Sequence, residues 1–242
     1  MIALLRKEIS VFFSTLTGYL AIVVFLAAIS LFMWVFPGGF NVIESGYANI
    51  DTLFIIAPWV FMFLIPAITM RSFSEEWRNG TIELLLTKPL TDWQIINAKF
   101  FAGLAIVVFS LLPTLTYYWS VKILSLSPGL DEGATWGSYF GLLFLASGFV
   151  AIGIFSSALS KNQIVAFILA VFLSFFFYVG FEQISSFSTI PGFDSFILQL
   201  GINEHYISMS RGVIDTRDLM YFVSLSVFFL YLTKMKLDSF KW

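Results

Sequence analysis

The chain has no cysteine and only one histidine among its 242 residues. Without cysteine, disulfide bonds, thiolate metal sites and cysteine nucleophiles are all excluded. The single histidine, His205, stands beside Glu204 in a polar segment, where we expect an ordinary loop or interfacial residue rather than a metal ligand. The sequence therefore predicts neither a metal site nor a cofactor site in this chain.

Charged residues are also scarce, at 12% of the chain, whereas soluble domains contain roughly 25%. Hydrophobic residues make up 59% of the chain. They fall into runs of about 17–22 residues, the length at which an α-helix crosses the hydrocarbon core of a membrane. The predicted fold class is an all-α polytopic membrane protein, with a single domain over residues 1–242. Its six transmembrane helices are expected at about residues 18–36, 52–70, 100–121, 136–159, 164–181 and 219–233.

Residues 2–14 carry apolar side chains at helical spacing on one side and polar side chains on the other. This pattern is typical of an amphipathic helix in the membrane interface; a polar, partly frayed start to the first span is the alternative. The first span is longer than the roughly 7–15 apolar residues of a signal peptide, and no small-x-small cleavage site follows it. We therefore expect this span to be retained.

The fourth span is rich in small residues, among them the pair Gly137 and Gly141. Small residues four positions apart let helices approach closely in lipid. This approach is expected within the monomer or, as the alternative, at an interface between subunits.

Six spans place both termini and residues 71–99 on the same side of the membrane. Ten of the thirteen Lys and Arg residues fall on that side, and only Lys122, Arg211 and Arg217 fall on the other. Positive residues concentrate on the cytoplasmic side of membrane proteins. The termini and residues 71–99 are therefore predicted to be cytoplasmic, and residues 182–218 to form an outer segment.

No ionisable side chain lies in the middle of any of the six spans. Ion-coupled carriers and voltage sensors commonly carry such groups, and intramembrane proteases need a catalytic His or paired Asp residues there. The chain also has no phosphate-binding loop, no H-E-x-x-H and no G-x-S-x-G. We therefore expect a non-catalytic protein, with any nucleotide bound by another subunit.

Residues 71–99 form the only long polar, helix-forming stretch between the spans. Phe73 and Trp77 stand at i and i+4 and would form an apolar stripe. Glu75, Glu76 and Arg78 would then face water or a partner.

The second half of residues 71–99 predicts the second helix of a hairpin. Gly80 permits a sharp bend, and Thr81 is expected to cap a short helix over residues 82–87, with Glu83 at its positive end. Pro89 follows the end of this helix. The capping-box pattern Thr91-x-x-Gln94 then opens a third helix toward the next span. This helical hairpin is predicted to be either a docking surface or an amphipathic loop on the lipid headgroups.

The order E-x-R-x-G-T-I-E-x-L-L-x-x-P, followed by Lys99, resembles the cytoplasmic signature of ABC-2 type transporter permeases. Its residues here are Glu76, Arg78, Gly80, Thr81, Ile82, Glu83, Leu85, Leu86 and Pro89. The resemblance covers the whole chain and implies that the hairpin is a coupling helix in a cleft of a separate ABC ATPase subunit. ATP and Mg would bind that partner. A second permease copy or paralogue would complete the transporter in the bacterial inner membrane.

The outer segment is similar to that of gliding-motility-associated GldF-type permeases. The matching residues are His205, Ser210, Arg211, Gly212, Asp215, Arg217 and Asp218. This similarity implies a GldG-type accessory membrane subunit and a link to gliding or associated secretion, with no nucleic acid among the partners. Short helices dipping into the outer leaflet are expected at residues 193–200 and 207–214.

Export driven by the partner ATPase is the function that this resemblance implies. The alternative is a membrane scaffold or mechanotransmission subunit that uses the strokes of the ATPase to remodel a partner. A membrane enzyme is disfavoured because no span carries a nucleophile with a neighbouring base.

Overall fold

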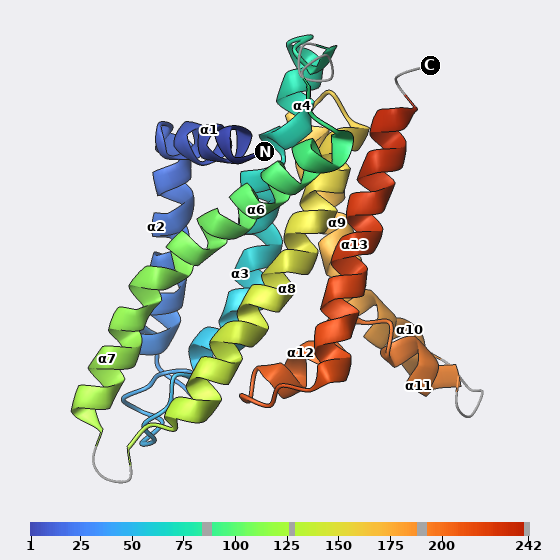
Figure 1. Ribbon diagram of the computed structural model, residues 1–242. Coiled ribbons are helices and arrows are strands. Elements are labelled where there is room, and N and C mark those ends of the chain that lie inside the picture. Colours follow the sequence, from blue (N-terminus) through green and yellow to red (C-terminus); the bar gives the residue numbers. More distant parts are fainter. Residues whose placement is uncertain (84–88, 126–128, 188–192, 240–242) are drawn as a thin grey trace.

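The computed structural model describes residues 1–83, 89–125, 129–187 and 193–239 (Figure 1). Its helical elements in chain order are α1 (Ile2–Phe13), α2 (Leu16–Ser30), the π-helix η1 (Leu31–Val35), α3 (Asp51–Thr69), α4 (Arg71–Arg78), α6 (Asp92–Leu111), the 3₁₀ turn η2 (Leu112–Thr114), α7 (Leu115–Leu124), α8 (Glu132–Leu159), α9 (Gln163–Phe175), the π-helix η3 (Phe176–Gly180), α10 (Phe181–Ser186), α11 (Phe193–Leu198), α12 (Ile202–Met209) and α13 (Thr216–Asp238).

Within the described residues, six helical stretches are long and apolar enough to cross a membrane, which confirms the predicted polytopic all-α fold. They are Gly18–Val35, Asp51–Arg78, Asp92–Leu124, Glu132–Leu159, Gln163–Ser186 and Thr216–Asp238. The last five extend beyond the predicted bounds. Polar residues add nothing to the length of a hydrophobic run, yet they extend these helices, at both ends except in Glu132–Leu159, which stops at the predicted residue.

The helices are arranged so that α1, α4 and the C-terminal end of α13 lie at one end of the bundle (Figure 1). We call this end the termini end. The opposite end, which carries α7, α11 and α12, we call the distal end. Helix α1 lies across the termini end instead of continuing the direction of α2, and it packs along α6.

Side-chain caps explain where several helices begin. The predicted capping box is confirmed: the Gln94 amide N–H donates to the Thr91 hydroxyl at 3.3 Å, and the Thr91 N–H donates to Gln94 Oε1 at 3.1 Å. Asp131, Asn162 and Asp215 accept backbone N–H bonds at the starts of α8, α9 and α13. Such caps satisfy N–H groups that have no carbonyl partner in the first helical turn.

The most buried span is α8, which packs against α3, α6, α9 and α13. Its small residues make this possible. A Cβ atom at Gly137 would lie 2.5 Å from the Gly212 carbonyl oxygen, and one at Gly141 would lie 2.7 Å from Met209 Cβ. The two glycines therefore let α12 and the α12–α13 connection lie directly on α8, so the expected close approach occurs within the monomer.

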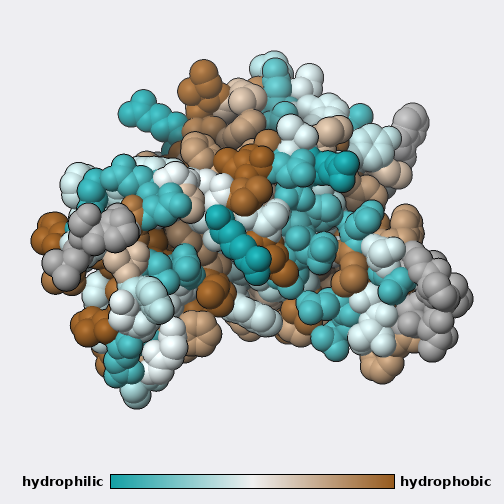
Figure 2. Space-filling view, turned by 90° about the horizontal axis from the view of Figure 1, so that it is seen from below, coloured by the Kyte–Doolittle hydropathy of each residue, from teal (hydrophilic) through white to brown (hydrophobic). Residues whose placement is uncertain are grey.

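The outer segment differs from its prediction in one respect. Helix α11 lies within the predicted residues 193–200, but the helix predicted at 207–214 is wrong, because α12 begins at Ile202 and ends at Met209. Gly212 has a left-handed φ of +81°, which ends helical structure before Asp215 caps α13. Seen from the distal end, hydrophilic residues gather over the middle of the face, with hydrophobic residues among and around them (Figure 2).

Candidate functional site

The predicted polar helix after the second span is present as α4, which follows α3 after an interruption at Met70. Phe73 and Ser74 are fully buried on one face of α4, whereas Arg78 at its end is exposed. Helix α4 packs against α8 and α9. It is therefore seated on the bundle along one face and presents its end outward.

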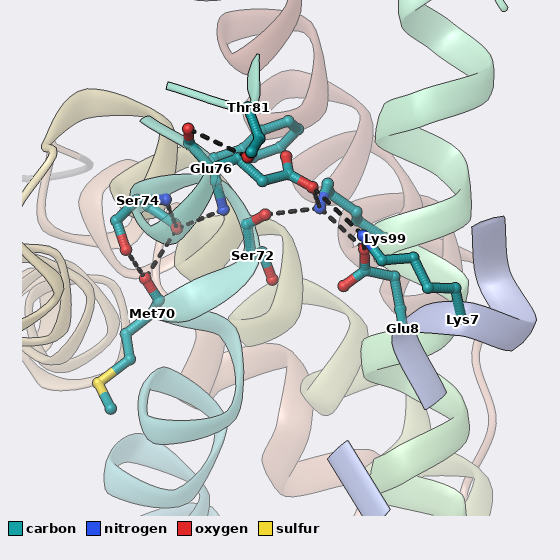
Figure 3. A network of polar contacts seen from close by, with 10 residues as sticks. Lys7, Glu8, Met70, Ser72, Ser74, Glu76, Thr81 and Lys99 are labelled. Atoms are coloured by element: carbon teal, nitrogen blue, oxygen red, sulfur yellow. Dashed lines mark hydrogen bonds and ion pairs between the residues drawn. The ribbon is translucent and has the colours of Figure 1, made fainter. Parts of the chain in front are cut away.

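A buried ammonium group joins α4 to two other helices (Figure 3). The side chain of Lys99, on α6, is only 1% exposed. Its Nζ donates to the Ser72 carbonyl at 2.6 Å, to Glu76 Oε1 at 3.0 Å and to Glu8 Oε1, on α1, at 3.1 Å. The same ammonium lies 4.9 Å from the centre of the Phe73 ring, a cation–π distance. The three helices α1, α4 and α6 therefore meet at one charge.

Glu76 is predicted from the sequence to face water or a partner, and for its side chain that prediction is wrong. It turns inward to Lys99 and is 13% exposed, because an ammonium from 23 residues further along the chain lies beneath it. Two carboxylates share this one buried ammonium, with the exposed Lys7 4.0 Å from Glu76. Removing one partner of a buried ion pair typically costs about 3–5 kcal/mol, since the other charge stays buried and uncompensated.

A serine on α8 ties the start of α4 to the core. The backbone N–H groups of Phe73 and Ser74 both donate to the Ser157 hydroxyl oxygen, at 2.9 and 3.1 Å, and that hydroxyl donates to the Met70 carbonyl at 2.9 Å. N–H groups at the start of a helix lack a carbonyl partner in their own helix, and Ser157 supplies one for two of them. The sequence did not predict this role for Ser157, because nothing in its spacing indicates a contact 83 residues away.

The bend after α4 occurs at Gly80, as predicted: its φ is +69°, and a Cβ atom at this position would have no neighbouring atom within 4 Å among the described residues. The hydroxyl of Thr81 donates weakly back to the Glu76 carbonyl at 3.4 Å. Glu83 and Pro89 are exposed. Leu85 and most of the helix predicted over residues 82–87 lie outside the described residues. Of the predicted coupling residues, Arg78, Gly80, Thr81, Glu83 and Pro89 are therefore on the surface at the termini end, while Glu76 is not.

The outer-segment residues divide into two groups. His205 and Asp218 are brought together between α12 and α13, with 2.8 Å from His205 Nδ1 to Asp218 Oδ1. His205 Nε2 lies 2.9 Å from the Gln199 carbonyl, and the Ser208 hydroxyl donates to the other Asp218 oxygen. Each ring nitrogen of His205 therefore lies within hydrogen-bond distance of an oxygen atom, one from a carboxylate and one from a backbone carbonyl. The cluster acts as a polar tie between two helices.

The remaining outer-segment residues serve the backbone or face outward. Asp215 caps α13 by accepting the Arg217 N–H at 2.9 Å. The side chains of Arg211 and Arg217 are exposed. Gly212 lies so close to α8 that a Cβ atom would sit 2.2 Å from Ala134 Cα. These positions explain local structure and do not form a common pocket with His205.

One buried tie at the distal end was missed by sequence analysis. The Tyr206 hydroxyl donates to the Phe54 carbonyl on α3 at 2.7 Å, a contact across 152 residues. Burial raises the pKa of the Tyr206 phenol well above its usual value, so the hydroxyl remains a neutral donor. Over the described ranges, no three His, Cys, Asp or Glu residues are grouped to hold a metal ion.

Comparison with known proteins found a family that matches most of the chain. A family model described as ABC-2 family transporter protein matches residues 39–234. The match takes in every helix from α3 to α12 and most of α13, including α4 and the outer segment, and leaves out α1 and α2. No curated protein matches the chain in sequence.

Proposed function

The chain belongs to the ABC-2 transporter family and is a permease subunit of an ABC transporter, and on this premise we propose that residues 71–99 couple it to a separate ATPase subunit. The observation that carries the proposal is the seating of α4. This helix is fastened to α1 and α6 through Lys99 and to α8 through Ser157, while its Arg78 end is exposed.

The seating of α4 supports a mechanical role. Helices are stiff along their axes, and coupling between distant sites is carried by rigid elements joined through packed and hydrogen-bonded contacts. A push on the surface around Gly80 and Glu83 would move α4, and the buried ties would pass that movement to α1, α6 and α8. The proline-containing α3, which precedes α4 directly, would carry it into the membrane.

The rest of the proposal concerns assembly and direction. The chain would pair with a second permease copy or paralogue, bind an ABC ATPase at the termini end, and reside in a bacterial inner membrane with cytoplasmic termini. The excess of Lys and Arg at the termini end supports this orientation. Export in gliding motility or associated secretion, with a GldG-type accessory subunit, is the process we propose.

The coupling proposal is tested with the double variant Gly80→Trp and Glu83→Arg in the purified complex. Both positions are exposed, so a bulky residue and a reversed charge should block docking. Because tryptophan is strained at the left-handed φ of Gly80, a thermal melt checks that the double variant remains folded. ATPase stimulation by the permease is expected to fall to the level of the free ATPase. Glu204→Arg, an exposed change at the distal end, is the matched control and should leave stimulation intact. Stimulation and assembly at wild-type levels in the double variant would show that another surface couples the subunits.

A role as a scaffold or mechanotransmission subunit is separated from export by reconstitution. Proteoliposomes that contain the complete complex should accumulate or release substrate with ATP if the protein exports. If ATP hydrolysis is stimulated by the wild-type permease but no transport occurs with the molecules secreted by the native cells, the scaffold role replaces export. Coupling through residues 71–99 is common to both roles.

A further inference from the structure

A groove of about 530 Å³ opens beside the Lys99 cluster, between α1 and α2 on one side and α3, α4 and α6 on the other. Its floor is apolar and includes Leu20, Val24, Phe63, Ala67, Ile68 and Ile106. Its rim at the termini end is polar and carries Glu8, Arg71, Glu75 and Lys99. An apolar groove with a charged rim at one end fits an amphiphile.

The rim charges are of both signs, and they differ in how they are paired. Lys99 and Glu8 are paired with each other. Arg71 and Glu75 stand four residues apart on α4, both partly buried, and in the described part of the chain neither side chain has an ion-pair or hydrogen-bond partner. A half-buried guanidinium and a half-buried carboxylate on neighbouring turns fit a ligand head that carries one negative and one positive group.

The rim also lies at the depth of lipid headgroups. Arg71 is the first charged residue after the apolar run of residues 52–70, Lys99 is the last before the apolar run that continues to residue 121, and no charged residue follows Glu8 until Glu44. Charged side chains at the ends of transmembrane helices reside at the membrane–water boundary. The apolar floor of the groove therefore lies at the depth of acyl chains.

We propose that this groove binds a phosphatidylethanolamine molecule of the adjoining leaflet. Its phosphate accepts hydrogen bonds from Arg71, its ammonium donates to Glu75, and one acyl chain lies along Ala67 and Ile68. Guanidinium–phosphate and ammonium–carboxylate contacts are charge-assisted and therefore strong. Phosphatidylcholine has no N–H to donate to Glu75, and phosphatidylglycerol has no cation to pair with it. The lipid holds α4 from the membrane side, where no side chain among the described residues pairs with Arg71.

Native mass spectrometry of the full-length protein, purified from native membranes in mild detergent with the subunits that accompany it, tests the proposal. After delipidation, the protein is titrated separately with phosphatidylethanolamine, phosphatidylglycerol and phosphatidylcholine. We expect retained phosphatidylethanolamine in the untreated protein and preferential rebinding of that lipid. A lost charge-assisted hydrogen bond corresponds to about tenfold in affinity, so both other lipids should bind about tenfold more weakly.

Three variants assign the contacts. Arg71→Gln should weaken phosphatidylethanolamine binding about tenfold. Glu75→Gln should remove the preference over phosphatidylglycerol, because the rim then carries a net positive charge. Ala67→Trp should fill the floor and abolish binding of all three lipids. Lys161→Gln, an exposed cation at the termini end, and Ala105→Trp, on α6 outside the groove, are the matched controls and should bind as wild type.

Several outcomes would overturn the proposal. Equal binding of the three lipids, or stronger binding of phosphatidylglycerol by the wild type, would refute a site for a zwitterion. Unchanged binding by Arg71→Gln would refute the assigned phosphate contact. Because the native chain has no cysteine, a single Ala67→Cys substitution also tests whether a second copy occupies the groove. Disulfide cross-linking between two such chains in native membranes, together with no retained lipid, would assign the groove to the permease dimer.

Discussion

At the termini end, three helices meet around the Lys99 ammonium, whereas at the distal end α8 and the α12–α13 connection touch backbone to backbone. The first joint depends on a buried charge shared by two carboxylates and a carbonyl. The second joint depends on Gly137 and Gly212. A Cβ atom at either glycine would overlap backbone atoms of the other segment. The Tyr206 hydroxyl adds a neutral hydrogen bond to α3 at the distal end.

The two joints differ in whether their helices can shift and still make favourable contacts. An ammonium with several acceptors can exchange one for another when a helix shifts, and such discrete alternatives are what switching proteins use. Two backbone segments in direct contact cannot pack in an alternative arrangement, because close-packed interiors tolerate very little displacement. If α4 moves as we propose, we therefore expect the distal joint to stay fixed and the Lys99 joint to exchange hydrogen-bond partners while keeping the three helices together.

The largest expected effect is on the charged joint. Lys99→Met leaves Glu8 and Glu76 facing each other without their buried cation, with only the exposed Lys7 nearby, and should lower stability by about 3–5 kcal/mol. The apparent melting temperature in detergent, followed by tryptophan fluorescence, measures the loss. Adding Glu8→Gln and Glu76→Gln to this variant removes the unpaired charges and should recover most of the stability. If Lys99→Met alone melts like the wild type, the cluster does not fasten α4.

The distal joint is tested by Gly212→Ala, which should cost about 2–4 kcal/mol, since it combines an unfavourable left-handed φ with overlap on Ala134. Gly46→Ala is the matched control, because Gly46 also has a positive φ, of +72°, but a Cβ atom there would have no atom of the described residues within 4 Å. The difference between the two melting temperatures isolates the cost of the close contact. Equal shifts in the two variants would mean that α8 and the connection are not in contact.

A smaller effect is expected at the neutral tie of α4. Ser157→Ala leaves the buried N–H groups of Phe73 and Ser74 without their acceptor and should cost about 1–3 kcal/mol. The neighbouring variant Ser156→Ala removes a buried hydroxyl that bonds to the Ile152 carbonyl of its own helix, so its shift should be smaller. Both shifts are read by the same thermal melt. A larger loss in Ser156→Ala would contradict the role given to Ser157.

The smallest effect is expected at a surface ion pair. Lys122 and Glu132 are 2.5 Å apart near the distal end, and both side chains are well exposed. Surface pairs contribute little because solvent and salt screen them. Lys122→Gln should therefore leave the melting temperature unchanged in low and high salt. A clear drop in the melting temperature would mean that this exposed ion pair contributes to stability as the buried Lys99 cluster does, contrary to the expected difference.

Much of the fold could be predicted from the sequence, because each span is a local property of hydrophobic run length. The capping box at Thr91 and the bend at Gly80 were also local and were predicted correctly. The span ends were less accurate: α13 runs from Thr216 to Asp238 because capping and helix propensity, not hydropathy, decide where a helix stops. The second outer helix was placed too late, because the predicted residues 207–214 include Gly212, whose positive φ ends helical structure.

The site residues were harder to predict because their partners are distant in sequence. Helical spacing placed Glu76 on the polar face of α4, but only tertiary structure brings Lys99 beneath that face. Ser157 and Tyr206 make contacts across 83 and 152 residues, and nothing in a single sequence indicates either partner. His205 and Asp218, by contrast, belong to one local motif, and the structure places them in contact.

The three side chains of the Lys99 cluster come from successive parts of the chain, which leave the ribosome in the order Glu8, Glu76 and Lys99. Both carboxylates are therefore synthesised before the ammonium that neutralises them. Until α6 has been made, Glu8 and Glu76 lack their buried cation, and the exposed Lys7 is the cation of α1 that lies within 4.0 Å of both. The ion pairs that join α1 and α4 to α6 can thus form only after the third of the six spans has been made, although α1 precedes all six spans in the chain.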